Sequence, residues 1–247
     1  MELYNDETLT RVNSNIELIQ KKDGLTFGTD AYLLSAYVRG TKYASTADLG
    51  CGTGIISLLL ASRGIFSKIY AVDIQKRFCD IAERNVHHNG FDNIIETVCC
   101  DVRDFSAECD VVFCNPPYMK NGSGKLNFST AKQIARHEIY GDIDSFTAAA
   151  SRILRYGGLF YAVYRADRMT DLLVSMRKNK IEPKRMTMVY PDDRHAPCML
   201  LVQGKKGANP SMYVTKPLLL KINGEDSDDI KYIYEKGEFG EQFEAQG

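Results

Sequence analysis

The chain has 247 residues, of which 44% are hydrophobic, and this composition is sufficient for a large folded core. The formal net charge of -1 excludes the strongly basic surface that an avid nucleic-acid-binding protein presents, so only local basic patches are available for such contacts. The polar N-terminus has no signal-peptide pattern and no apolar run is long enough to cross a bilayer, which predicts a cytoplasmic protein that does not bind membranes.

The first 43 residues predict a small N-terminal extension that packs on a larger domain formed by residues 44–247. Within the extension, the segment IELIQKKDGLTF predicts a hairpin that turns at Lys22–Gly24. The segment GTDAYLLSAYVRG predicts an amphipathic helix that begins near Thr29 or Asp30 and ends before Gly40.

From residue 44 onward, apolar runs rich in β-branched residues alternate with helical patterns. This alternation predicts an α/β fold with a doubly wound, mostly parallel sheet of seven strands, covered by helices on both faces. The last two strands are joined by a short connection, so we expect an antiparallel pair at one edge of the sheet. The expected strands are residues 44–49, 68–73, 94–100, 110–114, 158–164, 185–190 and 198–203.

The stretch ADLGCGTG, residues 47–54, joins the first strand of this sheet to a helix. Its glycines at positions 50, 52 and 54 allow a tight turn, in which backbone N–H groups approach a ligand at the helix N-terminus. Ile55 stands where a dinucleotide fingerprint has its third glycine, and this disfavours NAD as the ligand. The alternative is that Gly50, Gly52 and Gly54 only allow close packing of the helix on the strand.

Acidic residues follow three of the predicted strands at the same edge of the sheet. Asp73 lies 19 residues after Gly54, where a carboxylate can accept both hydrogen bonds of a ribose diol. Together with Asp48 it disfavours a pyrophosphate and suits a cationic ligand. Asp101 is placed to reach an adenine ring, and capping of the turn in DVRDF is an equal alternative.

The fourth strand ends in Asn115-Pro116-Pro117-Tyr118, beside the end of the first strand. The side-chain carbonyl of Asn115 and the backbone carbonyl of Pro116 can accept both N–H groups of a planar amine and direct its lone pair at a methyl donor. Tyr118 can stack on the ring that carries the amine. The alternative is a rigid strand exit without a chemical role, in which proline only ends the ladder of hydrogen bonds.

The glycine turn and the NPPY segment together resemble the class I S-adenosylmethionine (SAM) methyltransferases that modify adenine N6, guanine N2 or glutamine N5. The segments DGLTFGTDAYLLSAYV, AKQIARHEIYGDIDSF and residues 202–235 further resemble the bacterial valine-tRNA adenine N6-methyltransferase family, and the resemblance covers residues 13–235. It implies a class I methyltransferase Rossmann-like fold. It also implies methyl transfer from SAM to the N6 amine of an adenine in RNA, with tRNA near the anticodon favoured.

Other functions stay open beside this one. The acceptor could be an rRNA base, a DNA adenine or a protein glutamine. The chain could also be a non-catalytic SAM-fold module that binds RNA. An anticodon-loop purine is already partly unstacked, whereas a duplex adenine must be flipped, so we favour a structured RNA loop.

The resemblance implies which residues bind the cofactor and the RNA. Thr29 and Asp30 would lie at the SAM pocket, with helix capping as the alternative for Asp30. The expected SAM-binding residues are Thr29, Asp30, Asp48, Gly50, Gly52, Gly54, Asp73, Ile74, Asp101, Val102 and Asn115. RNA phosphate would be bound by Lys120, Lys125 and Arg136, with surface ion pairs as the alternative, and the basic stretches 176–185 and 205–206 are also usable.

The cysteines give no indication of a metal site. All seven lack a CxxC spacing and have no histidine at a ligand spacing, so we predict reduced thiols and no bound metal. No sequence feature points to a particular oligomeric state.

Overall fold

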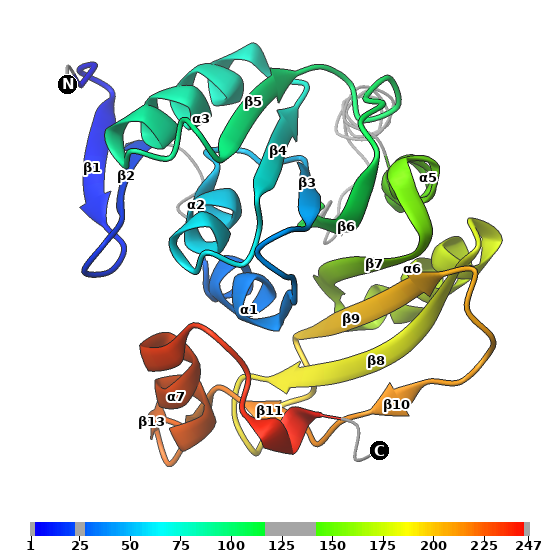
Figure 1. The fold of residues 1–247 in the computed structure, drawn as a ribbon. Coiled ribbons are helices and arrows are strands. Elements are labelled where there is room, and N and C mark those ends of the chain that lie inside the picture. The colour runs from blue at the N-terminus through cyan, green and yellow to red at the C-terminus, as the bar shows by residue number, and fades with distance from the viewer. Residues whose placement is uncertain (1–2, 23–27, 117–141, 245–247) are drawn as a thin grey trace, which may run out of the picture.

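One twisted sheet runs through the part of the chain that the computed structural model describes, residues 3–22, 28–116 and 142–244 (Figure 1). Its strands are β3 (Ser45–Leu49), β4 (Lys68–Asp73), β5 (Ile95–Cys99), β6 (Cys109–Cys114), β7 (Leu154–Arg165), β8 (Ile181–Tyr190), β9 (Met199–Lys206), β10 (Tyr213–Val214) and β11 (Leu218–Leu219). The helices are α1 (Thr29–Tyr37), α2 (Ile55–Ser62), α3 (Lys76–His88), α5 (Ile143–Ile153), α6 (Met169–Lys178) and α7 (Asp228–Lys236). Two short hairpins lie outside the sheet, β1 (Glu7–Arg11) with β2 (Glu17–Lys21), and β12 (Lys221–Ile222) with β13 (Glu225–Asp226).

The order of the long strands is β5-β4-β3-β6-β7-β9-β8, with β10 and β11 both paired to β8. Strands β5 to β7 are parallel, as expected, and β9 is antiparallel to both of its neighbours. The predicted doubly wound α/β fold is therefore confirmed. The expected antiparallel pair, β8 with β9, lies on the outer side of β7, and its antiparallel member β9 is inserted between β7 and β8 instead of forming the edge itself. Leu200, Leu201 and Val202 are fully buried, which suits a strand inside a sheet better than an edge strand.

Apolar residues form one layer on each face of the sheet. On the first face, Leu33 and Tyr37 of α1 lie in one cluster with Leu58 of α2 and Ile230 of α7. On the other face, α5 and α6 supply the buried side chains, among them Phe146. The two helical layers are visible on opposite sides of the sheet in Figure 1. None of the described helices is both long enough and apolar enough to span a membrane.

The described N-terminal hairpin is one that the sequence did not predict. β2 pairs with the preceding strand β1 through a turn at residues 12–16, and the expected turn at Lys22–Gly24 lies mostly outside the described residues and stays a prediction. The side chain of Asn13 closes this turn, since its Oδ1 accepts hydrogen bonds from the backbone N–H groups of Asn15 and Ile16 at 2.8 and 2.9 Å. Residues 23–27 lie outside the described part of the chain.

A buried asparagine joins this hairpin to the glycine turn. Asn85 of α3 accepts a hydrogen bond from the N–H of Ile19 at 2.7 Å and donates to the carbonyl oxygens of Ile19 at 3.1 Å and Thr53 at 2.9 Å. Helix α1, from the same N-terminal segment, contributes to the main core. The division of the chain at residue 43 stays a prediction.

Candidate active site

The turn between β3 and α2 depends on its three glycines. Gly50, Gly52 and Gly54 have φ angles of +79°, +56° and +82°, a region that other residues rarely adopt. Gly54 is the N-cap of α2. A Cβ on Gly52 would meet no described atom within 4 Å. The turn therefore faces open space at Gly52, and a ligand can approach its backbone there.

Asp73 holds this turn against the end of β4. Its Oδ2 accepts the backbone N–H of Gly52 at 3.0 Å, and its Oδ1 accepts that of Gln75 at 2.8 Å. The side chain is buried, which raises its pKa, while the two backbone hydrogen bonds oppose the rise. Since each oxygen has a second lone pair, the carboxylate can still accept hydrogen bonds from a ligand. The next residue, Ile74, is 36% exposed and offers an apolar surface beside it.

Asp48 at the end of β3 is a second buried acid. Its Oδ2 accepts a hydrogen bond from the hydroxyl of Ser57 at 2.8 Å, and its Oδ1 has no partner among the described residues. Burial, together with the nearby charge of Asp73, raises the pKa of Asp48 to about 7. A cation or a hydrogen-bond donor near this pair would relieve the cost of burial.

The third acidic residue, Asp101, closes the turn that follows β5. Its Oδ1 accepts the backbone N–H of Arg103 at 2.8 Å, and the guanidinium of the same arginine binds the carboxylate at 2.9 Å. This ion pair lowers the pKa of Asp101. Asp101 thus caps the turn, as one of its two alternatives stated, and its contact with an adenine stays a prediction. Val102 is buried in the same apolar cluster as Phe105.

Asn115 follows β6 directly, and β6 pairs with β3 through Cys114 and Leu49, so the amide lies beside the glycine turn. Its Nδ2 donates a hydrogen bond to Oδ2 of Asp30 at 2.8 Å. Its Oδ1 is buried and has no partner among the described residues. Pro116 is also buried. Pro117, Tyr118, Lys120, Lys125 and Arg136 lie outside the described part of the chain.

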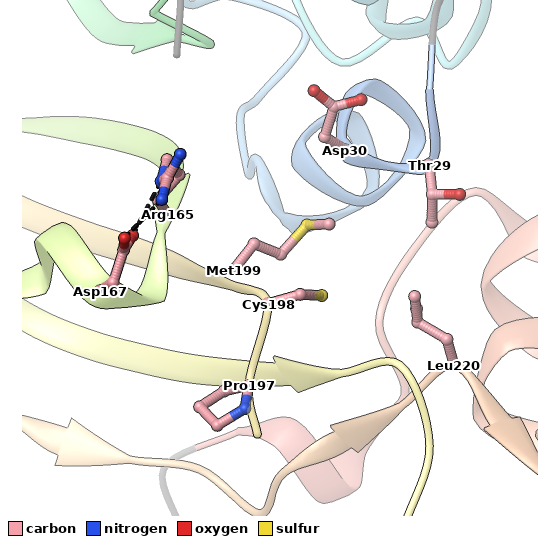
Figure 2. A pocket seen from close by; sticks show the side chains of 8 residues that line it. All are labelled: Thr29, Asp30, Arg165, Asp167, Pro197, Cys198, Met199 and Leu220. Carbon is pink, nitrogen blue, oxygen red and sulfur yellow. Dashed lines mark hydrogen bonds and ion pairs between the residues drawn. The ribbon is translucent and has the colours of Figure 1, made fainter. Parts of the chain in front are cut away.

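Asp30 lies in the first turn of α1, whose N-cap is Gly28. Together with Thr29 it lines a pocket of about 650 Å³ (Figure 2). The other lining residues are Arg165, Asp167, Pro197, Cys198, Met199 and Leu220.

Figure 2 shows how separate elements contribute to this pocket, with Arg165 at the carboxyl end of β7 and Met199 at the start of β9. Arg165 pairs with Asp167 through its Nε at 2.8 Å. Because Asp30 both lines the pocket and contacts Asn115, the pocket adjoins the amide. The sequence did not indicate the other six lining residues as part of a site, although Arg165 directly follows a predicted strand at the ligand-binding edge.

The basic stretches outside the site are engaged elsewhere. Lys205 pairs in register with Leu159 and Glu182, near the starts of β7 and β8. It therefore lies toward the amino ends of the parallel strands, whereas Asn115 lies at their carboxyl ends. Arg177 pairs with Glu182 at 3.1 Å. Both residues therefore lie on an exposed surface away from the pocket, where Arg177 is ion-paired.

Comparison with known proteins identifies the family. Residues 22–179 match the model of the methyltransferase small domain. A tRNA1(Val) (adenine(37)-N6)-methyltransferase from Phocaeicola vulgatus is 30% identical over 183 residues, which cover 72% of this chain and 76% of the relative. The chain belongs to this methyltransferase family. A protein of the same name from Tolumonas auensis is 30% identical, with 67% and 73% covered. The methyltransferase spans about half the length of the Shewanella relatives that it matches, such as the one from Shewanella halifaxensis.

Solved structures confirm the class I methyltransferase fold. A predicted O-methyltransferase from Agrobacterium tumefaciens has a TM-score of 0.70 at 18% identity, covering 86% of this chain and 98% of that chain. The M. jannaschii TYW2 in complex with AdoMet has a TM-score of 0.56 at 13% identity, with 83% and 87% covered. At these identities the likeness concerns the fold.

SAM is the cofactor of this methyltransferase family, and the residues present fit it. Gly52 leaves its turn open to a ligand, and Asp48 and Asp73 suit a cationic molecule with a ribose diol. The buried Oδ1 of Asn115 lies beside the same turn and lacks a partner among the described residues. All of these groups lie at the carboxyl edge of the parallel strands, where open α/β folds bind ligands.

Proposed function

We propose that this methyltransferase transfers a methyl group from SAM to the N6 amine of an adenine in tRNA, near the anticodon. The observation that carries the proposal is the buried Oδ1 of Asn115, an acceptor without a partner among the described residues, at the end of β6 beside the glycine turn. The names of the relatives from Phocaeicola vulgatus and Tolumonas auensis support adenine 37 of a valine tRNA as the position.

The chemistry follows from the weakness of the nucleophile. The lone pair of an adenine amine is delocalised into the ring, so the nitrogen must be re-hybridised before it can attack. We assign this role to the side-chain carbonyl of Asn115 and the backbone carbonyl of Pro116, which would accept the two N–H groups. SAM, when bound, supplies an electrophilic methyl group. The methylated nitrogen is acidic and loses its proton to water, so no strong base is required.

The cofactor-side residues have separate proposed roles. Asp73 would accept hydrogen bonds from the ribose diol, and Asp101 and Val102 would contact the adenine of SAM. Ile74 would cover one face of that adenine. Asp48, whose Oδ1 has no partner among the described residues, would provide a negative charge for the cationic part of the cofactor.

The acceptor would approach from the pocket lined by Thr29, Asp30 and Arg165. Arg165 could exchange its contact with Asp167 for an RNA phosphate, since the pair is partly exposed. Stacking by Tyr118 and phosphate contacts by Lys120, Lys125 and Arg136 stay predictions. An RNA loop suits this site better than duplex DNA, because its bases are already splayed. We place this activity in the cytoplasm, as expected for a tRNA-modifying enzyme.

Labelled SAM tests the proposal directly. The purified protein is incubated with labelled SAM and, separately, with total RNA, DNA and protein from a host that lacks it, and the labelled product is digested and identified. We expect label in N6-methyladenosine from tRNA. Label only in glutamine or in DNA would reject the RNA assignment, and no label in any fraction would favour a non-catalytic RNA-binding module.

The Asn115→Ala variant tests the proposed catalytic residue. We expect methyl transfer to fall below detection while the calorimetric affinity for SAM stays within about threefold, a change of less than roughly 1 kcal/mol. An equal loss of both would assign Asn115 to the cofactor pocket alone.

A further inference from the structure

The amide of Asn115 has two chemically different ends, and among the described residues only one of them has a partner. Its Nδ2 donates to Oδ2 of Asp30 at 2.8 Å, across 85 positions in the sequence. Its buried Oδ1 has no partner among the described residues. A carboxylate only accepts hydrogen bonds, so a contact with Asp30 requires the NH₂ group of the amide to face it.

We propose that Asp30 is a positioning residue, whose carboxylate fixes the orientation of the Asn115 amide so that Oδ1 faces the acceptor amine. This inference rests on the proposed function. In the opposite orientation, two oxygen acceptors would face each other at the same distance, and the NH₂ group would face the N–H groups of the substrate. Such an amide could not accept the amine. One carboxylate thus selects the productive orientation.

The contact also makes Asn115 a better acceptor. The negative charge of the Asp30 carboxylate, which accepts the hydrogen bond from Nδ2, shifts electron density in the amide toward Oδ1, because hydrogen bonds in series polarise one another. The effect is strongest where water is excluded, and Oδ1 is buried. Asp30 therefore has an electrostatic as well as a geometric role.

The fold holds Asp30 rigidly enough for this purpose. Leu33, Leu34 and Tyr37 of the same helix are all fully buried, so α1 cannot shift without disturbing the core. The place of Asp30 on the pocket wall in Figure 2 puts it on the side from which we propose that the acceptor enters.

Three variants and one control test the inference. The measurement is steady-state methylation of the acceptor that the labelled-SAM experiment has identified. We expect Asp30→Ala to lower kcat by about 10- to 100-fold, as for the loss of one charged hydrogen bond, with the SAM Kd and the acceptor KM within about threefold. Asn115→Asp alone places two carboxylates together and should lower kcat at least as much. Ser35→Ala, which loses a hydrogen bond within α1, should retain the wild-type kcat.

The reciprocal double variant Asp30→Asn with Asn115→Asp is decisive. It restores one donor and one acceptor between the two positions and again leaves an oxygen toward the substrate, so kcat should recover by at least about tenfold over Asn115→Asp. A structural role alone would not produce this recovery. Failure to recover in a double variant whose thermal unfolding matches the wild type would overturn the proposal.

Two further results would also overturn it. One is an Asp30→Ala variant with unchanged kcat, and the other is a loss confined to SAM affinity, which would make Asp30 a cofactor ligand. A different result rejects the proposed function, namely label in a product other than N6-methyladenosine. The effect of Asp30→Ala on kcat is then measured with the acceptor of that product.

Discussion

Replacing Asp73 by alanine separates the two tasks of this carboxylate. It accepts backbone N–H groups from Gly52 at 3.0 Å and Gln75 at 2.8 Å, and we propose that it also binds the ribose of SAM. Removal leaves two backbone donors without acceptors, at ~1–3 kcal/mol each, so the free energy of unfolding should fall by roughly 2–6 kcal/mol. Two lost hydrogen bonds to a charged group would weaken SAM binding by ~3–6 kcal/mol.

The lower end of that range is the expected one, because both oxygens of Asp73 already accept a backbone N–H group. Burial, which raises the pKa of Asp73, costs free energy both with and without SAM, so it offsets part of the loss of stability and does not change the loss of affinity. About 3 kcal/mol corresponds to roughly a 100-fold increase in the Kd of SAM. Calorimetric titration measures this change, and urea unfolding measures the loss of stability.

Asp110→Ala is the matched control. Asp110 near the start of β6 accepts the backbone N–H of Ser45 at 2.9 Å and pairs with Arg155 at 2.9 Å, at the opposite edge of the sheet. It should lower stability without changing SAM affinity. If Asp73→Ala bound SAM within threefold of the wild type while losing the expected stability, Asp73 would only hold the turn. If Asp110→Ala weakened SAM binding equally, the effect on affinity would be an indirect result of lower stability.

Three other variants give independent predictions. The pKa of Asp48 is raised from 3.8 to about 7 in the folded protein, so its favourable contribution is complete below pH 4 and is lost as the pH rises to about 7. This loss of stability is on the order of 4 kcal/mol, at 1.36 kcal/mol for each pH unit. Urea unfolding at several pH values should show that Asp48→Asn removes this dependence of stability on pH. The same dependence in the variant would mean that another group titrates. Gly52 has a φ of +56° and open space around it, so Gly52→Ala should lower the free energy of unfolding by only ~1–2 kcal/mol. It should nevertheless weaken SAM binding by at least about tenfold in calorimetry. Unchanged binding would place the cofactor away from this turn. Asn85→Ala leaves a buried N–H and two carbonyl oxygens of Ile19 and Thr53 unpaired, so urea unfolding should show a loss of ~2–4 kcal/mol, and a loss below 1 kcal/mol would mean that water replaces the amide.

Most of the sheet could be predicted because its information is local. Each parallel strand is a short apolar run between helical patterns, and such runs are recognisable without knowledge of their neighbours. The position of β9 is different, because the pairing of Leu201 with Val163 joins segments far apart in the chain. The hydrophobic run MLLV was a signal for an interior strand, although the short connection to β8 suggested a simple edge hairpin.

The hairpin at the N-terminus shows why a turn without glycine is hard to predict. The described turn VNSNI lacks the glycine that hairpin turns usually need, and the stretch KKDG, which contains one, lies mostly outside the described residues. Asn13 compensates with two hydrogen bonds from its side chain to the backbone. Such an Asx turn depends on the side-chain geometry, so a pattern of residue types alone ranks it too low.

The site was predictable to the extent that each residue follows a strand. Asp48, Asp73 and Asn115 each lie at a strand end, and a parallel sheet brings those ends to one edge. The contact between Asp30 and Asn115 could not be deduced in this way, because it depends on where α1 packs. The same holds for the pocket wall formed by Cys198 and Leu220, which only the assembled fold brings together.

Three carboxylates of the site, unlike Asp101 with its ion pair to Arg103, share a feature that bears on how the site acts. Asp73 holds the glycine turn, Asp48 accepts a hydrogen bond from Ser57, and Asp30 holds the amide of Asn115. Each charge is thus attached to a neutral group of the protein, and at Asn115 it is a neutral oxygen that we propose to face the amine. A charge placed one hydrogen bond behind an amide can orient and polarise it without bringing a second titrating group to the reaction centre. Removing Asp30 should therefore disturb the orientation of the acceptor amine more strongly than it disturbs the binding of SAM.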